Sequence, residues 1–163
     1  MSRHMEIERK FLVVRPPTGW RGHASSQIVQ GYFPVGDRNL EIRLRRKGSR
    51  HFITVKGGRG RRRLEEEIEI PKSKFSALWP LVHRTSISKR RYKIPFHGHT
   101  IEMDVYQGPY RGLMTADIEF DSVNASHSFQ PPDWVGREIT GNRQYANANL
   151  ARARGLPRSR KRA

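Results

Sequence analysis

Eight segments of this chain alternate polar and apolar residues with a period of two, and this pattern constrains the fold more than any other feature. Successive side chains of a strand point to opposite faces, so such segments are typical of β-strands with one apolar face. Gly, Pro, Asn and Asp residues bound them, which favours antiparallel pairing. The expected strands cover residues 5–14, 27–33, 40–46, 51–56, 63–70, 87–94, 100–106 and 115–121.

Helices have a smaller share of the sequence. The segment "KFSALWPLV", residues 74–82, is expected to form a short helix capped by Ser73, and "NRQYANANLARA", residues 142–153, is expected to form a terminal helix. Residues 152–163 hold six basic residues and no acid, which predicts a disordered basic arm. The 163 residues therefore suggest one folded domain, residues 1–151, followed by a tail, residues 152–163.

The polar faces of the expected strands are sorted by charge. A face exposed to water is the ordinary explanation for one alternating strand, but such faces usually mix charged and neutral polar residues. Here three strands carry sets of one sign, and two others carry two charges of one sign with a single opposite charge. The sets include Glu6 and Glu8 with Lys10, Arg43 and Arg45 with Glu41, Glu65 with Glu67 and Glu69, Lys89 with Arg91 and Lys93, and Asp117 with Glu119 and Asp121.

Sorted charges need counter-charges close by. Two like charges 4 Å apart repel by about 1 kcal/mol in water and by about 4 kcal/mol at an effective dielectric of 20. Eight strands closed into a barrel leave an interior about wide enough for side chains or one small ligand. We therefore predict an α+β fold, mainly antiparallel β: a closed eight-stranded barrel with a charged interior, its outer apolar faces covered by the helices near Phe75 and Tyr145.

The composition limits the classes of ligand, metal and partner that this protein can bind. The formal net charge of +17 favours polyanionic ligands such as phosphate compounds or nucleic acid. The absence of cysteine excludes disulfides and thiolate metal sites, so any metal would be bound by oxygen or imidazole. No apolar run approaches the length of a signal peptide core or a membrane helix, so we expect a soluble cytoplasmic protein without a membrane partner. The segment "VKGGRGRRR" lacks the Gly-Lys-Ser/Thr end of a phosphate-binding loop and is expected to form a hairpin turn.

Ten short motifs occur in an order that resembles the CYTH family, also called triphosphate tunnel metalloenzymes, in its short stand-alone bacterial form. The resemblance extends over about residues 5–150. The motifs are "EIERK", "QGYF", the Arg-x-Arg of "IRLRR", "TVKG", the Glu-x-Glu of "LEEEIEI", "ISKRRY", "IEMDVYQG", "GLMTADIEF", "WVGREIT" and "YANANL".

The resemblance implies a tunnel of eight antiparallel strands that acts on triphosphates with Mg²⁺ or Mn²⁺. It implies metal ligands at Glu6, Glu8, Asp104, Asp117 and Glu119, although the family more often has Glu at the position of Asp117. It implies a phosphate-binding set of Lys10, Arg43, Arg45, Lys56, Lys89 and Arg91, with Arg63 as a further member, and catalytic roles for Glu65, Glu67 and Lys10.

The function expected from the resemblance is hydrolysis of inorganic tripolyphosphate to pyrophosphate and phosphate. Nucleoside triphosphatase, thiamine triphosphatase and class IV adenylate cyclase are alternatives on the same fold, although no base pocket is visible in the sequence. A different class, a non-catalytic binder of polyphosphate or nucleic acid, is favoured by the net charge and the basic arm. Such a binder would need no divalent metal, and its affinity would fall steeply with salt.

Overall fold

The computed structural model describes residues 7–37, 39–57 and 64–157. Nine strands form one antiparallel sheet in the order β5-β4-β3-β2-β6-β7-β8-β1-β9. The eight expected strands are present with shifts of a few residues, whereas β9 was not expected. The strands are β1 Ile7–Val13, β2 Ser25–Tyr32, β3 Leu40–Lys47, β4 Arg50–Gly57, β5 Leu64–Glu69, β6 Ser86–Phe96, β7 His99–Tyr106, β8 Met114–Phe120 and β9 Val135–Glu138.

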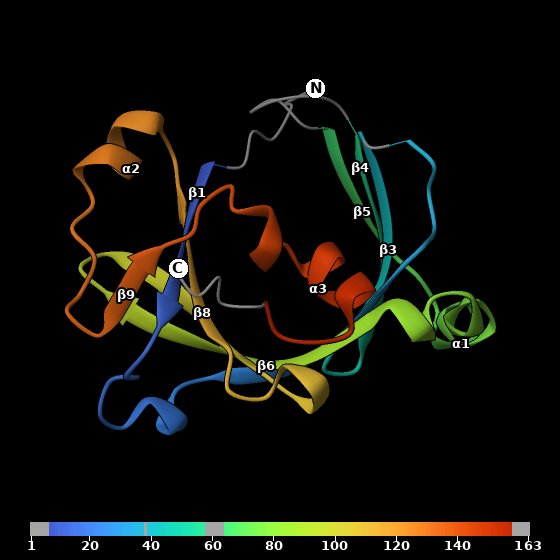
Figure 1. Ribbon diagram of the computed structural model, residues 1–163, viewed down its shortest axis with the longest axis horizontal. Coiled ribbons are helices and arrows are strands. Elements are labelled where there is room, and N and C mark those ends of the chain that lie inside the picture. The colour runs from blue at the N-terminus through green and yellow to red at the C-terminus, as the bar shows by residue number, and fades with distance from the viewer. Residues whose placement is uncertain (1–6, 38, 58–63, 158–163) are drawn as a thin grey trace, which may run out of the picture.

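The sheet curls so that its two ends stand apart from each other. Figure 1 shows β1, β8 and β9 on one side, β3, β4 and β5 on the other, and β6 beneath them. Strands β5 and β9 are the two ends of the hydrogen-bonded order, and no ladder of the described residues joins β5 to β1 or β9. The antiparallel α+β fold is thus confirmed, but closure of the barrel is not. The turn predicted for "VKGGRGRRR" lies mostly outside the described residues.

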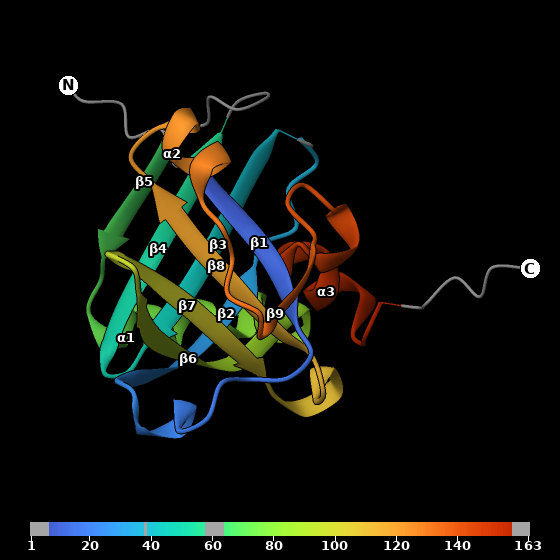
Figure 2. The same ribbon diagram turned by 90° about the vertical axis from the view of Figure 1, so that its left-hand side faces the viewer.

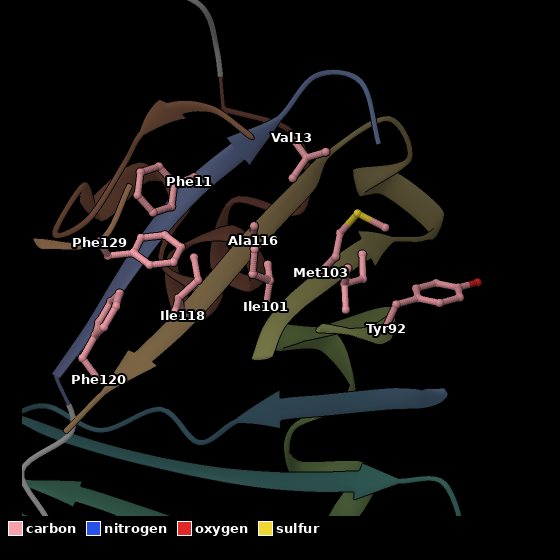
Figure 3. Close-up of a cluster of buried hydrophobic side chains, with 10 residues drawn as sticks. Phe11, Val13, Tyr92, Ile101, Met103, Ala116, Ile118, Phe120 and Phe129 are labelled. Carbon is pink, nitrogen blue, oxygen red and sulfur yellow. The ribbon is translucent and has the colours of Figure 1, made fainter. Parts of the chain in front are cut away.

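The apolar side chains of β1, β7 and β8 form the main core on the outer face of the curled sheet. Figure 3 shows Ile101, Met103, Ala116 and Ile118 side by side along these strands, and all four are fully buried. Phe129, from the segment that follows α2 (Val123–Ser128), packs onto them. Figure 2 looks onto this side of the molecule. The 3₁₀ segment η1 (Trp20–Gly22) adds Trp20 to the same cluster. The remaining 3₁₀ segments are η2 Trp79–Leu81, η3 His83–Thr85, η4 Gly108–Tyr110 and η5 Arg143–Tyr145.

Helix α1 (Lys72–Leu78) covers the outer face of the opposite side. Its Phe75 packs with Leu44 of β3 and Val82. The prediction that Ser73 caps this helix is wrong, because the helix begins directly after Pro71 and contains Ser73 in its first turn. The α-helix then gives way to η2, which contains Pro80, because proline lacks the N–H that a continuing α-helix needs.

Helix α3 (Asn147–Ala153) lies between the two sides of the sheet instead of outside it (Figure 1). Its buried Leu150 belongs to one cluster with Tyr32 of β2 and Tyr106 of β7. The expectation that the segment near Tyr145 covers an outer face is therefore wrong.

The predicted arm does not begin at residue 152, because α3 continues to Ala153. Residues 158–163 of that arm lie outside the described part of the chain. None of the helices in the described ranges has the length and apolar character needed to cross a bilayer.

Candidate active site

A cavity of about 500 Å³ lies between the two sides of the curled sheet. The charge-sorted strand faces line it, as the sequence pattern predicts. Seven acidic and six basic residues occur among the described lining, so their charges nearly cancel. The lining consists of Glu8, Lys10, Tyr32, Glu41, Arg43, Arg45, Lys47, Lys56, Glu65, Glu67, Arg91, Glu102, Asp117, Glu119 and residues 146–148.

Arg43 is the central cation of the wall formed by β3, β4 and β5. Its side chain is only 8% exposed, and the nearest carboxylates are Glu65 at 3.5 Å and Glu41 and Glu67, both at 3.9 Å. None of these contacts is a hydrogen bond, and Arg43 Nε has no hydrogen-bond partner among the described residues. Five donors are available on a guanidinium. The buried Arg43 is thus held loosely enough to bind another anion.

The two glutamates of β5 balance the other cations of this wall. Glu65 lies 2.6 Å from Lys56 Nζ, and Glu67 lies 3.4 Å from Arg45 and accepts a hydrogen bond of 2.9 Å from Thr54 Oγ1. The register explains these contacts, because Lys56 is paired with Glu65 across β4 and β5, and Thr54 with Glu67. Burial, assisted by the neighbouring Arg43, lowers the pKa of Arg45 to about 10, so the side chain stays charged at neutral pH.

Carboxylates dominate the opposite wall, formed by β1 and β8. Glu8 and Glu119 are directly opposite each other in the ladder, and no described cationic side chain lies within 4 Å of either carboxylate. Burial and the nearby Asp117 carboxylate raise the pKa of Glu8. Asp117 Oδ1 is buried and accepts no hydrogen bond from the described residues, although Lys10 Nζ lies 3.0 Å from it. Burial opposes the charge on Lys10, but the Asp117 carboxylate outweighs this effect and raises the pKa of Lys10.

These carboxylates fit a hard divalent cation, with the substrate as a further source of ligands. Glu8, Asp117 and Glu119 offer oxygen atoms, which Mg²⁺ and Mn²⁺ prefer. Within residues 7–37, 39–57 and 64–157, however, no three acidic or histidine side chains converge closely enough to hold a metal by themselves. Mg²⁺ commonly takes one or two carboxylates and completes its shell with water and phosphate oxygens. Water molecules, and phosphate oxygens when a substrate is bound, would therefore supply the remaining ligands.

Asp104 and Lys89 lie behind the cavity wall and do not line it. Both are fully buried, and Lys89 Nζ donates to Asp104 Oδ2 at 2.5 Å. Arg91 donates two further bonds of 2.7 Å to Asp104, so both carboxylate oxygens are engaged. Burial lowers the pKa of Lys89 to about 7 against the effect of Asp104. Burial also disfavours the charged form of Asp104, but Lys89 and Arg91 outweigh it and lower the pKa of this carboxyl.

Arg91 connects this buried pair to the cavity. It lines the cavity and also contacts Asp117 at 3.2 Å and Glu102. Of the residues predicted for the site, the structure thus brings ten to one cavity and places Lys89 and Asp104 directly behind it. Glu6 and Arg63 lie outside the described residues.

Sequence reasoning missed several lining residues. Glu41 was expected on the charged face with Arg43 and Arg45 but was given no role in the site. Lys47 and Glu102 also share strand faces with predicted site residues, so the same period of two could have assigned all three to it. Tyr32 carries no charge, and Asn147 comes from α3, which was expected on the outside. Tyr106 donates a hydrogen bond of 2.6 Å to Asn147 Oδ1 and so ties α3 to β7.

Comparisons with known proteins agree with this geometry. The family model described as CYTH domain matches residues 4–152. An inorganic triphosphatase of Nitrosomonas europaea is 40% identical over 148 residues, which are 90% of this chain and 96% of the relative. An inorganic triphosphatase of Acetivibrio thermocellus is 36% identical over 149 residues, 90% of this chain and 93% of the relative. A crystal structure of an inorganic triphosphatase superimposes with a TM-score of 0.71 at 36% identity, covering 91% of this chain and 95% of that one.

Proposed function

Because this chain belongs to the CYTH domain family, we propose that it is an inorganic triphosphatase that hydrolyses tripolyphosphate to pyrophosphate and phosphate. Relatives at 36–40% identity over nearly their whole length carry the name inorganic triphosphatase. The cavity has no apolar recess suited to a nucleobase or thiamine among its described lining, in which charged residues predominate. An inorganic polyanion is the ligand that such a lining fits best.

The observation that carries the proposal is the separation of charges across the cavity. Glu8 and Glu119, which have no cation within 4 Å in the described part of the chain, lie on the β1–β8 wall, and the weakly held Arg43 lies on the β3–β5 wall. A triphosphate that carries a divalent cation has the complementary distribution. Its metal would meet the carboxylates while its phosphate oxygens meet the cations.

Specific roles follow for the residues of this chain. We assign metal binding to Glu8, Asp117 and Glu119, with Glu6 as a further ligand. A divalent metal bound there would neutralise phosphate charge and lower the pKa of bound water. We assign phosphate binding to Lys10, Arg43, Arg45, Lys56 and Arg91, with Arg63 as a further member.

Glu65 and Glu67 have two roles in this proposal. Before substrate binds they hold the cations of the β3–β5 wall in place. When phosphate oxygens take over these cations, the two carboxylates become available to accept hydrogen bonds from the attacking water. Lys89 and Asp104 act from behind the wall by fixing the orientation of Arg91, and this replaces the metal-binding role expected for Asp104.

We further propose that the barrel closes around the bound triphosphate. In the described residues β5 has one unpaired edge, and β9 pairs with β1 only near Phe11 and Val13, which leaves the beginning of β1 unpaired on that side. A ligand that bridges the two walls would draw these edges together. Distances between spin labels at the exposed positions 66 and 121, measured by pulsed electron paramagnetic resonance with and without tripolyphosphate and metal, test this closure. A distance that shortens supports it, and an unchanged distance contradicts it.

The function is tested by phosphate release from tripolyphosphate, ATP and thiamine triphosphate, with Mg²⁺, with Mn²⁺ and with chelator, and with analysis for cyclic AMP. The proposal expects the highest kcat/KM on tripolyphosphate and loss of turnover with chelator. Cyclic AMP as the main product, or higher kcat/KM on ATP or thiamine triphosphate, would replace it by another CYTH activity. Binding without turnover, weakened steeply by salt and unaffected by chelator, would identify a polyanion-binding protein instead.

A further inference from the structure

We propose that Gln30 is a positioning residue that orients Arg45 and Tyr32 toward the bound triphosphate, an inference that rests on the proposed function. Gln30 is fully buried in β2 and does not line the cavity. Its Oε1 accepts a hydrogen bond of 3.1 Å from Arg45 Nε, and its Nε2 donates one of 2.5 Å to the Tyr32 hydroxyl. One amide thus holds two side chains that do line the cavity.

The sheet register places Gln30 for this role. It is directly opposite Arg45 in the β2–β3 ladder, and Tyr32 follows two residues later on the same face of β2. Its neighbour in the β2–β6 ladder is the apolar Ile87, which offers the amide no side-chain partner. Arg45 Nε can only donate, so it must face the amide oxygen, and the amide nitrogen must then face Tyr32. The orientation of the amide is therefore determined on both sides.

The contact with Arg45 fixes the plane of a cation. A guanidinium is planar, so anchoring Nε determines where its terminal nitrogens point. One of them, NH1, lies 3.4 Å from Glu67 at the cavity. Without Gln30 the buried Arg45 would lose its only side-chain acceptor other than Glu67 among the described residues. Its terminal nitrogens would then sample orientations that do not meet phosphate oxygens.

The contact with Tyr32 fixes the direction of a hydroxyl proton. Because the hydroxyl oxygen accepts from Gln30, its own proton remains for another acceptor. Among the described residues Tyr32 donates no side-chain hydrogen bond. Burial raises its pKa to about 12, so the proton is retained at neutral pH. Tyr32 is thus a neutral donor at the cavity surface, suited to a phosphate oxygen.

Two substitutions of Gln30 test its hydrogen bonds to Arg45 and Tyr32 separately. Gln30→Met keeps the length of the side chain and removes both hydrogen bonds. Gln30→Glu keeps an acceptor for Arg45 but cannot donate to Tyr32, and it would draw the Tyr32 proton away from the cavity. Gln27→Met is the matched control, since Gln27 lies on the opposite face of the same strand and bonds to Ser88 and Gln107.

Steady-state kinetics on tripolyphosphate with metal should distinguish the variants. We expect Gln30→Met to raise KM about tenfold and to lower kcat, which is the order of magnitude for losing a hydrogen bond to a charged group. Gln30→Glu should keep KM within about threefold of wild type, yet lower kcat about tenfold. Gln27→Met should match wild type. KM and kcat within twofold of wild type for Gln30→Met would overturn the proposal. If the Met variant does not fold, an unchanged kcat for Gln30→Glu would overturn it instead.

An NMR measurement tests the same contact independently of turnover. The Arg45 Nε–Hε resonance should be protected from solvent exchange in the wild type and in Gln30→Glu, and unprotected in Gln30→Met. Equal protection in all three would contradict the role of Gln30. Absence of tripolyphosphate turnover in the wild type would instead contradict the proposed function, and the resonance would still report on Gln30.

Discussion

Glu8 of β1 and Glu119 of β8 are paired directly across the ladder, and neither carboxylate has a described cation within 4 Å. Two like charges this close favour an added cation. We therefore predict that Mg²⁺ or Mn²⁺ raises the Tm of the substrate-free wild-type protein, because a ligand that binds only the folded state stabilises it.

The variant Glu8→Gln should lose this metal-dependent rise in Tm and, with it, turnover of tripolyphosphate. Thermal unfolding with and without metal, together with phosphate release, measures both effects. Glu66→Gln is the control, because Glu66 is on the other face of β5 and does not line the cavity. Turnover near the wild-type rate in Glu8→Gln would contradict the assignment of Glu8 as a ligand.

Phosphate binding at position 43 should require arginine, and lysine should not replace it. Its fork of donors can bind two phosphate oxygens at once, whereas an ammonium acts as a point charge. We expect Arg43→Lys to raise KM for tripolyphosphate by at least about tenfold, given about 1.5–3 kcal/mol for a hydrogen bond to a charged group. Arg46→Lys, at an exposed position on the other face of β3, should leave KM unchanged. Equal KM values for both variants and the wild type would exclude Arg43 from phosphate binding.

Asp104 should behave as the counter-charge of Lys89 and Arg91 and not as a metal ligand. Asp104→Asn leaves the buried Lys89 without its described counter-charge, while Arg91 keeps Glu102 and Asp117. Breaking a buried ion pair costs about 3–5 kcal/mol. Urea unfolding should show a loss of this order, while metal should still raise the Tm of the variant. Asp121→Asn, exposed just beyond β8, is the control. If Asp104→Asn keeps wild-type stability but loses the response to metal, Asp104 is a ligand after all.

Arg9 joins three segments on the outer side of the sheet. It donates bonds of 3.0 and 2.7 Å to the Glu138 carboxylate of β9 and bonds of 2.9 and 3.1 Å to the carbonyl oxygens of Ser126 and Phe129. Arg9→Met should lower the free energy of unfolding by about 1–2 kcal/mol, since several net hydrogen bonds are lost. Turnover should change little. A stability equal to wild type would contradict this role.

Glu138 supplies the pH-dependent part of that contact. The hydrogen bond from Arg9 lowers the pKa of Glu138, so the ionised form stabilises the folded state. This contribution is complete above the unfolded pKa of about 4.3 and is lost as the pH falls through the lower folded value. Because the pair is partly exposed, we expect Glu138→Gln to cost only about 0.5 kcal/mol at pH 7, and progressively less as the pH falls through the folded pKa. A difference from wild type that does not shrink at all as the pH is lowered would contradict this linkage.

The alternation of residue types predicted the strands and the inward direction of the charged faces, but not the depth of each charge. Lys89 and Arg91 share a face of β6, yet one is behind the cavity wall and the other lines it. Lys89 ends against Asp104 and the ring of Tyr106, both on β7, and strand periodicity does not encode these contacts. Gln30 was missed for a related reason: a neutral amide becomes part of a site only through the register with Arg45 on the next strand.

Short elements were missed because their signals are weak. Strand β9 has four residues, too few for a clear alternation. Helix α2 has no apolar periodicity, although Ser122 accepts a hydrogen bond from the backbone N–H of Ala125 and could have marked its start. The apolar face of α3 indicated a helix but not the side of the sheet on which it packs.

The near cancellation of charge within the cavity has a consequence for how quickly substrate arrives. Since the described lining is almost neutral, the +17 of the chain must reside elsewhere, and its field extends into the solvent. Such a field accelerates diffusional encounter with multiply charged anions, and added salt screens it over about 10 Å at 0.1 M. The association rate of tripolyphosphate should therefore fall with ionic strength much more than the rate at which the bound complex hydrolyses it. Stopped-flow mixing at several salt concentrations would measure the two rates separately.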